Sequence, residues 1–171
     1  MKKSNLFLGF LVYVFAFGLL FTGCGGSDEP DTWSTVSSIN QLNGTWHGSY
    51  SEKYAWKDLA TGEENLFNGN VTVVVDYILT YNASAKTERL FMNQKISCSG
   101  GNISTAWPQI KAIMQQDGFS TFNDASYTGS SVFDETFTIS DNKLTGYKIN
   151  QNGKKMKCAY YRNEEVIFTK Q

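Results

Sequence analysis

The sequence predicts an all-β fold, a single antiparallel up-and-down sheet of seven or eight strands with one short inserted helix. From Ile39 onward, apolar residues recur with a period of two, which is typical of strands with one buried face. Turn residues separate the strand-like segments. Aromatic residues make up 15% of the chain and charged residues only 18%, which indicates a packed core. A sheet of this kind must hide its edges, so both a closed barrel and a two-sheet sandwich fit the pattern.

The first 23 residues are expected to be a signal peptide. Two lysines follow Met1, and a run of 16 residues from Leu6 to Phe21 carries no charge. A membrane-spanning helix needs about 20 apolar residues, whereas a secretory segment is shorter and ends at small residues. The run ends in the residues Leu20-Phe21-Thr22-Gly23-Cys24. The alternative interpretation is an uncleaved anchor helix with an incidental cysteine.

This ending resembles the lipobox of bacterial lipoproteins, although Phe21 stands where the family usually has Leu. In that family a peptidase cuts before the cysteine and the thiol carries diacylglycerol, so the resemblance implies lipidation of Cys24. Several acyl chains together hold a protein stably on a membrane. Residues 24–38 would then be the lipidated cysteine and a flexible tether rich in Gly, Ser and acids. The expected location is the bacterial cell envelope, with the outer membrane or the cell surface favoured, and not the cytoplasm.

The charge balance limits the partners of the mature chain. Loss of residues 1–23 removes two lysines and no acid, which leaves 13 basic and 16 acidic residues and a net charge of −3. This mild acidity argues against nucleic acid as a partner and against electrostatic adhesion to anionic lipid. Lys154, Lys155 and Lys157 cluster beside a predicted turn, where we expect them to protect a strand edge from pairing.

The strands are predicted from alternation and the helix from a change of period. Within 70–81 the odd-numbered residues share one apolar face, as do the even-numbered residues of 46–56 and of 90–98. Residues Thr105–Asp117 have helical spacing, with Pro108 suited to the first turn and Gly118 to the exit. The C-terminal strands are expected at residues 132–140, 144–150, 155–162 and 166–170, with Asn152-Gly153 as a hairpin turn.

The start of the first strand, Leu42-Asn43-Gly44-Thr45-Trp46, resembles the opening of bacterial lipocalin-like lipoproteins. That family has a Gly-x-Trp motif in the first strand of an eight-stranded up-and-down barrel, so the resemblance implies such a barrel at 39–171. It also implies that Gly44 and Trp46 close the barrel floor. In the family an Arg or Lys of the last strands stacks on this Trp, and Arg162 fits that role by parity. The inserted helix departs from the family pattern, and the family's second motif has no clear counterpart.

Catalytic chemistry finds little support in the sequence. His47 is the only histidine and follows Trp46, so we expect it to face solvent and predict no metal site. Adjacent acids on a strand point to opposite faces and do not form an acid–base pair. The sequence contains no phosphate loop, dinucleotide fingerprint or nucleophile elbow. We therefore expect neither an enzyme nor a cofactor.

Cys98 and Cys158 remain as a pair once Cys24 carries lipid. Both fall on the apolar parity of their strands, and an exported protein resides where disulfides persist. They are therefore candidates for a disulfide bond, which would stabilise the fold by about 4 kcal/mol in the chain-entropy model. The alternative is two buried free thiols that pack as small apolar side chains.

The inward-facing positions of the strands supply a candidate ligand site. A small-molecule pocket requires a concave, mostly apolar lining with a few polar groups. The predicted lining residues are Tyr50, Glu52, Tyr54, Trp56, Tyr77, Tyr81 and Gln94. The leading hypothesis is a lipid-anchored barrel that binds a small apolar ligand without covalent chemistry. The alternative is a filled barrel whose loops at 57–68 and 100–129 bind another protein, as an interaction or inhibitor module.

Overall fold

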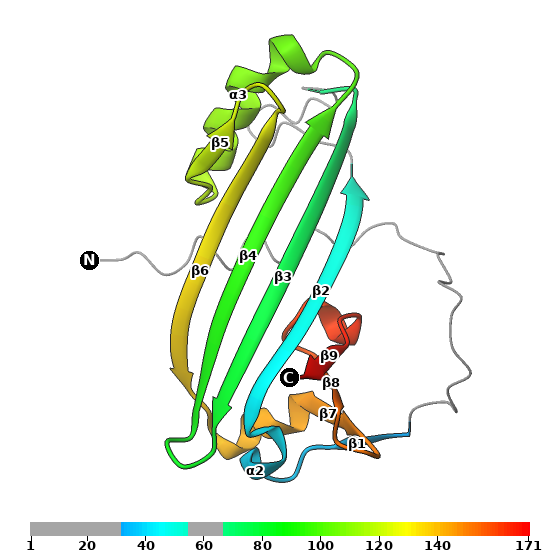
Figure 1. The fold of residues 1–171 in the computed structure, drawn as a ribbon, viewed down its shortest axis with the longest axis vertical. Coiled ribbons are helices and arrows are strands. Elements are labelled where there is room, and N and C mark those ends of the chain that lie inside the picture. Colours follow the sequence, from blue (N-terminus) through cyan, green and yellow to red (C-terminus); the bar gives the residue numbers. More distant parts are fainter. Residues whose placement is uncertain (1–31, 55–66) are drawn as a thin grey trace. The chain divides into compact units, whose positions relative to one another are not determined.

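The part of the chain that the structure describes forms one antiparallel sheet of nine strands, which confirms the all-β prediction (Figure 1). The computed structural model describes residues 32–54 and 67–171. The predicted signal peptide, Cys24 and Trp56 lie outside these residues. In the described part the strand order is β1-β7-β8-β9-β2-β3-β4-β6-β5. The long central strands are β2 (Gly44–Tyr54), β3 (Asn70–Asn82), β4 (Thr87–Ser99) and β6 (Thr128–Thr138).

Five short strands extend the sheet on both sides of the long ones. They are β1 (Trp33–Thr35), β5 (Thr121–Asn123), β7 (Tyr147–Asn150), β8 (Lys155–Cys158) and β9 (Phe168–Lys170). The last strand pairs with the first long one, with Lys170 opposite Trp46. At the other side β5 covers only the first part of β6, opposite Thr128–Ser130. The sheet therefore has more strands than the predicted seven or eight, because β1 and β5 were not anticipated.

The folded domain begins earlier than predicted. Residues 33–35 belong to the expected tether, yet they pair with β7 as strand β1, and the following Val36 is only 2% exposed. A short helix α2 (Ile39–Leu42) then replaces the first predicted strand residues. Ser38 caps it, and Gln41 completes a capping box, which satisfies the backbone N–H groups of the first turn. Burial of Val36 and Leu42 explains why this segment is held against the sheet.

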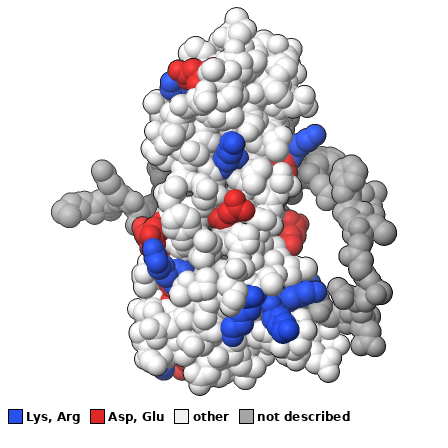
Figure 2. Space-filling view, viewed as in Figure 1, with Lys and Arg blue, Asp and Glu red and all other residues white. Residues whose placement is uncertain are grey.

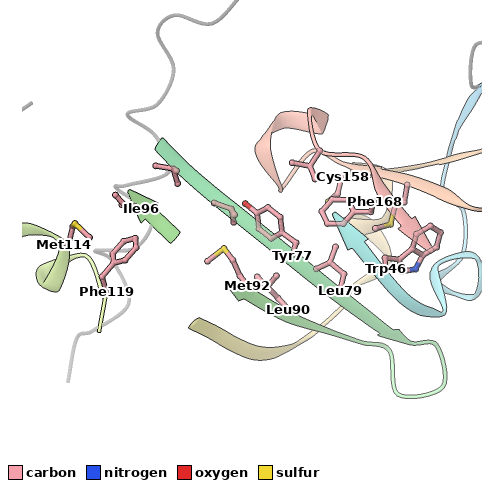
Figure 3. Close-up of a cluster of buried hydrophobic side chains, with 14 of the residues drawn as sticks. Trp46, Tyr77, Leu79, Leu90, Met92, Ile96, Met114, Phe119, Cys158 and Phe168 are labelled. Atoms are coloured by element: carbon pink, nitrogen blue, oxygen red, sulfur yellow. The ribbon is translucent and has the colours of Figure 1, made fainter. Parts of the chain in front are cut away.

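The predicted alternation of β3 is confirmed. Its odd-numbered residues from Val71 to Tyr81 are all buried, while Val74 and Ile78 on the other face are each 37% exposed. We call the buried side the inner face of the sheet. The core on this face is shown in Figure 3, where Trp46 and Phe168 pack near Leu79. Phe168 packs closely over Gly48, and a Cβ atom at that position would lie 2.7 Å from the Phe168 ring.

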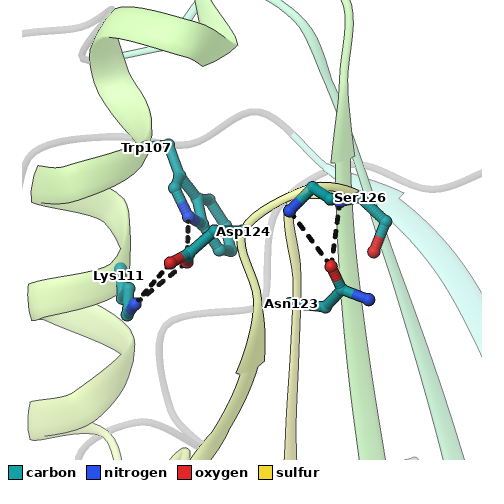
Figure 4. Close-up of polar contacts among 6 residues, drawn as sticks. Trp107, Lys111, Asn123, Asp124 and Ser126 are labelled. Atoms are coloured by element: carbon teal, nitrogen blue, oxygen red, sulfur yellow. Dashed lines mark hydrogen bonds and ion pairs between the residues drawn. The ribbon is translucent and has the colours of Figure 1, made fainter.

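The predicted inserted helix is present as α3 (Ile103–Gln116), which begins two residues before the predicted Thr105. It lies at one end of the long strands beside β5 (Figure 1). Its Trp107 packs edge-on against Phe122 and donates its indole N–H to Asp124 at 2.8 Å (Figure 4). Lys111 binds the same carboxylate at 2.9 Å, and these donors together hold the pKa of Asp124 below its usual value. The helix is therefore fixed to the β5–β6 turn through both apolar and charged contacts.

The C-terminal part departs most from the predicted strands. Residues predicted to begin a strand at 144 lie instead in a 3-10 helix, η1 (Asp141–Gly146). The strand predicted over 155–162 ends at Cys158, and Arg162 lies in a second 3-10 segment, η2 (Arg162–Glu164). The β7–β8 connection has a positive φ at Gly153, of 71°, but not at Asn152, so it is not the predicted two-residue hairpin turn. None of the helices in the described ranges is long and apolar enough to cross a membrane.

Candidate functional site

The strand register places the predicted lining residues on one face. Tyr50 of β2 lies opposite Val75 of β3, which lies opposite Gln94 of β4. Glu52, Tyr77 and Tyr81 have the same parity and therefore face the same side. Trp56 and the side chain of Tyr54 lie outside the described part of the chain. The inner face is thus the surface that the sequence predicted as the ligand site.

The lining residues differ in what they contact. Tyr77 and Tyr81 are 7% and 2% exposed and belong to the core, whereas Tyr50, Glu52 and Gln94 remain partly exposed. Tyr50 stacks on Tyr77 with ring centroids 6.1 Å apart. The Gln94 amide donates to the thioether of Met92 at 3.5 Å, and sulfur is a weak acceptor. Polar hydrogen-bonding capacity therefore remains at Gln94.

Arg162 contacts the partly exposed end of this face and not the floor. Its guanidinium donates to the Glu52 carboxylate and lies 4.9 Å from the centroid of the Tyr50 ring. The backbone at Arg162, Asn163 and Glu164 is left-handed, with φ values of 57°, 51° and 68°. Three successive non-glycine residues in this region are costly, so the contacts of Arg162 must hold the turn in place.

Lys170 occupies the place that the lipocalin resemblance assigned to Arg162. Its Nζ lies 5.2 Å from the centroid of the fully buried Trp46 ring, whose indole N–H donates to the carbonyl of Leu42 at 2.6 Å. Gly44 has a φ of 117°, and a Cβ there would lie 3.2 Å from Lys170 Cε. Gly44 and Trp46 therefore both lie against Lys170, and the prediction that Arg162 stacks on Trp46 was wrong. The pairing of β9 with β2 brings in the last lysine of the chain instead.

A buried carboxylate that the sequence analysis did not single out lies at the end of the inner face. Glu88 is 0% exposed, and the hydroxyls of Tyr147 and Tyr161 both donate to it. Lys143 Nζ lies 3.5 Å from the same carboxylate. We call Glu88, Tyr147, Tyr161 and Lys143 the Glu88 cluster. One signal was present, because Glu88 continues the even-numbered parity of Leu90 to Cys98 and is therefore a charged residue at an inward position.

The environment of the cluster favours neutral phenols. Burial is the main reason that the pKa values of Tyr147 and Tyr161 are raised well above the ordinary value near 10. Burial also raises the pKa of Tyr81, and its ring packs edge-on against Tyr147 with centroids 5.8 Å apart. The hydroxyls therefore stay protonated as donors to Glu88, and the cluster ties β4 to β7 and to the segment after β8.

Alkaline pH should unfold the protein through these tyrosines. In the unfolded chain they ionise from about pH 10, whereas in the folded chain they remain neutral, so the unfolded state releases protons that the native state keeps. Stability should be unaffected by these groups below pH 10 and fall as the pH rises above it. Urea titrations across this range measure the effect, and Tyr147→Phe should make the decline shallower. An unchanged urea midpoint up to about pH 11 would contradict the expected shifts.

The predicted disulfide is absent, because both cysteines are buried free thiols. Cys158 lies opposite Tyr147, whose hydroxyl reaches Glu88 at the start of β4, whereas Cys98 lies near the other end of that strand. Cys98 follows Glu88 by ten positions along β4, which is about 33 Å along a strand. The alternation correctly predicted that both thiols lie on the inner face, but they are at opposite ends of it.

Both thiols should resist modification in the native protein. Burial raises the pKa of Cys98 to about 11 and that of Cys158 to about 12, so about one thiol in a thousand or fewer is ionised near pH 8. A Cys24→Ser variant should show no reaction with a thiol reagent when folded and two reactive thiols in denaturant. Fast reaction of the folded protein would contradict the burial. Equal masses before and after reduction would confirm that no disulfide forms.

The outer face offers little chemistry in the described residues. His47 lies 3.9 Å from Asp76, and both side chains are about half exposed, at 46% and 47%. This agrees with the expectation that His47 faces away from the core. A shallow hollow on this face is lined by Ile78, Thr80, Arg89 and Phe91. No group of three or more candidate metal ligands occurs within residues 32–54 and 67–171.

The comparisons with known proteins add no relative. No protein-family model, curated protein or solved structure matches the chain. Its function is therefore inferred from its own residues.

Proposed function

We propose that the chain is a lipid-anchored protein of the bacterial cell envelope whose lipocalin-like domain binds a small, largely apolar molecule on the inner face. The observation that supports this proposal is the shared position of Tyr50, Glu52 and Gln94, which line one face and remain partly exposed beside the core. A few polar groups above an apolar surface are what small-molecule sites use for orientation and specificity. No bond is made or broken, so the function is sequestration or delivery.

The contacts at this face indicate the chemistry of the ligand. An apolar or aromatic body would pack on Tyr50 and on Val73 and Met92, which are 7% and 8% exposed. Arg162 is already paired with Glu52, so a charged group on the ligand is not required. Gln94 can exchange its weak contact with Met92 for a carbonyl or hydroxyl of the ligand. We therefore expect an uncharged or weakly polar molecule with one hydrogen-bonding group.

Extraction of the purified protein with organic solvent, followed by mass spectrometry, tests for a co-purified molecule of this class. Quenching of tryptophan fluorescence by fatty acids, retinoids or haem gives an affinity. Gln94→Leu should weaken binding by about tenfold, the equivalent of one hydrogen bond. Asn93→Leu is the matched control, because Asn93 is the exposed neighbour on the opposite face. A clean extract with no quenching by any of these ligands would overturn the carrier function.

Lipid anchoring is tested separately. Cys24→Ser should release the protein from the membrane fraction and remove the mass of the acyl chains. Retention of this variant in membranes washed with high salt would contradict lipidation at Cys24, whatever the result of the ligand experiments.

A protein-interaction module is the second candidate, and one observation favours it. Strand β5 pairs with β6 only at Thr128–Ser130, and no other strand of the described chain pairs with the same side of residues 131–138. Val132 in this stretch is 63% exposed. An unpaired strand edge can add a strand from a partner. If a partner protein no longer binds the Val132→Asp variant but still binds the Gln94→Leu variant, this function is supported over the carrier function.

A further inference from the structure

Positive charge is concentrated on three neighbouring short strands. Five lysines lie in β7, β8, β9 and the β7–β8 connection, and neither residues 147–158 nor residues 168–170 contain an acid. They are Lys148, Lys154, Lys155, Lys157 and Lys170. Figure 2 shows basic side chains gathered over the region of β8 and β9 on the face in view. Lys170 has the parity of the buried Phe168 and lies over Trp46, so it is not part of this surface. We call the surface of the other four lysines, together with Trp33 of the adjoining β1, the basic face.

Edge protection does not explain these lysines. Strand β8 lies between β7 and β9, so the prediction that Lys154, Lys155 and Lys157 guard an open edge was wrong. Met156 and Cys158 of β8 are fully buried, and the alternation of the strand places Lys155 and Lys157 on the outer face.

The pairing of Lys148 with Lys157 places two positive charges side by side on the sheet. Lys148 lies directly opposite Lys157 in the register, and like charges in this position destabilise a sheet. Glu164 lies 2.7 Å from Lys148 and offsets part of this repulsion. Lys157 is placed over the ring of Trp33, with its Nζ 4.5 Å from the centroid. An external anionic surface would stabilise both lysines further.

We propose that the basic face docks on the anionic phospholipid headgroups of the membrane that holds the anchor. This inference rests on the proposed lipidation of Cys24. Trp33 follows Cys24 by only nine positions, which limits the distance between them to about 30 Å. The tether therefore leads from the lipid to β1, the strand beside the basic face. Trp33 suits the membrane interface, where amphipathic rings accumulate, and Ile167, 46% exposed, precedes β9 on the same side of the domain.

The net charge of −3 predicts no such adhesion, but net charge does not decide binding at close range. Salt screens charges beyond about 10 Å, so acids elsewhere on the domain contribute little at this surface. Each lysine near an anionic membrane strengthens binding by about fivefold. Several lysines on one face are enough for a measurable effect, and the orientation they impose would turn the opposite side of the domain away from the membrane.

The test uses two forms of the protein. A chain that starts at Gly25 lacks the lipid and retains the complete described domain, whose core is made from its own residues. It is sedimented with vesicles of phosphatidylcholine alone or with about a third phosphatidylglycerol. The lipidated protein is reconstituted in the same vesicles, and quenching of Trp33 by brominated lipids is measured, with Trp33→Phe as the reference.

The anchor-free chain should bind the phosphatidylglycerol vesicles, and added salt should release it. Lys154→Gln/Lys157→Gln should weaken this binding by about 25-fold. The control Lys53→Gln/Lys95→Gln, which removes the same charge from exposed positions on β2 and β4, should change it less than about twofold. Trp33 of the lipidated protein should be quenched more with phosphatidylglycerol than without it.

Equal binding to both vesicles, or an equal loss in both double variants, would overturn the docking proposal. Binding of the anchor-free chain to another protein in place of vesicles would overturn it as well. Added salt releases a protein held only by the basic face. Retention of Cys24→Ser in membranes washed with high salt would therefore contradict the anchor instead, so the two failures are distinguishable.

Discussion

Replacing Glu88 by alanine should destabilise the domain by about 3–5 kcal/mol, because the change leaves buried partners without their acceptor. Tyr147 and Tyr161 both donate to this carboxylate, and Lys143 lies 3.5 Å from it. With the carboxylate removed, the two tyrosine hydroxyls lose their acceptor. Lys143, whose side chain is 27% exposed, loses its opposite charge. Glu88 is fully buried, so water cannot simply replace it.

Urea unfolding measures this loss, and two variants separate its sources. Glu88→Gln keeps an acceptor for one tyrosine but leaves Lys143 without its opposite charge, so it should cost less than alanine. Glu135→Ala is the control. Glu135 also has inward parity and lies two residues from Phe137, the residue opposite Glu88, but its side chain is exposed. If Glu88→Ala and Glu135→Ala cost the same, the Glu88 cluster does not stabilise the fold.

Period-two alternation predicted the side of the sheet on which each residue lies. The buried odd-numbered residues of β3 and the shared face of Tyr50, Glu52 and Gln94 follow from it directly. Alternation carries no information on the position along a strand. Cys98 and Cys158 were therefore given the right side but the wrong neighbours.

Backbone geometry and long-range pairing account for the remaining errors. The alternation of apolar residues predicted a strand as far as Arg162, but β8 ends at Cys158. Arg162, Asn163 and Glu164 then adopt left-handed backbone angles, which no local sequence pattern indicated. The lipocalin resemblance implied a cation over Trp46, and one is present. Its identity as Lys170 depends on the register between β9 and β2, which sequence alone does not contain.

Trp46→Ala should be the other large loss, at about 3–5 kcal/mol, because it empties the largest fully buried site of the inner face. The substitution removes the contact with Lys170 and leaves the carbonyl of Leu42 without the indole donor, bound at 2.6 Å. Trp46→Phe should retain part of the packing and cost less.

Two further variants identify the cation that belongs to this site. Lys170→Met keeps the aliphatic contact but removes the charge, and should cost about 0.5–1 kcal/mol in the wild type and almost nothing in the Trp46→Ala background. Arg162→Met should be additive with Trp46→Ala, since Arg162 lies over Tyr50. Thermal or urea unfolding of the two double-mutant cycles measures both couplings. Only the β9–β2 pairing brings Lys170 to the Trp46 ring. A coupling of Trp46 with Arg162 and none with Lys170 would therefore contradict the observed register. It would support instead the predicted stacking of Arg162 on Trp46.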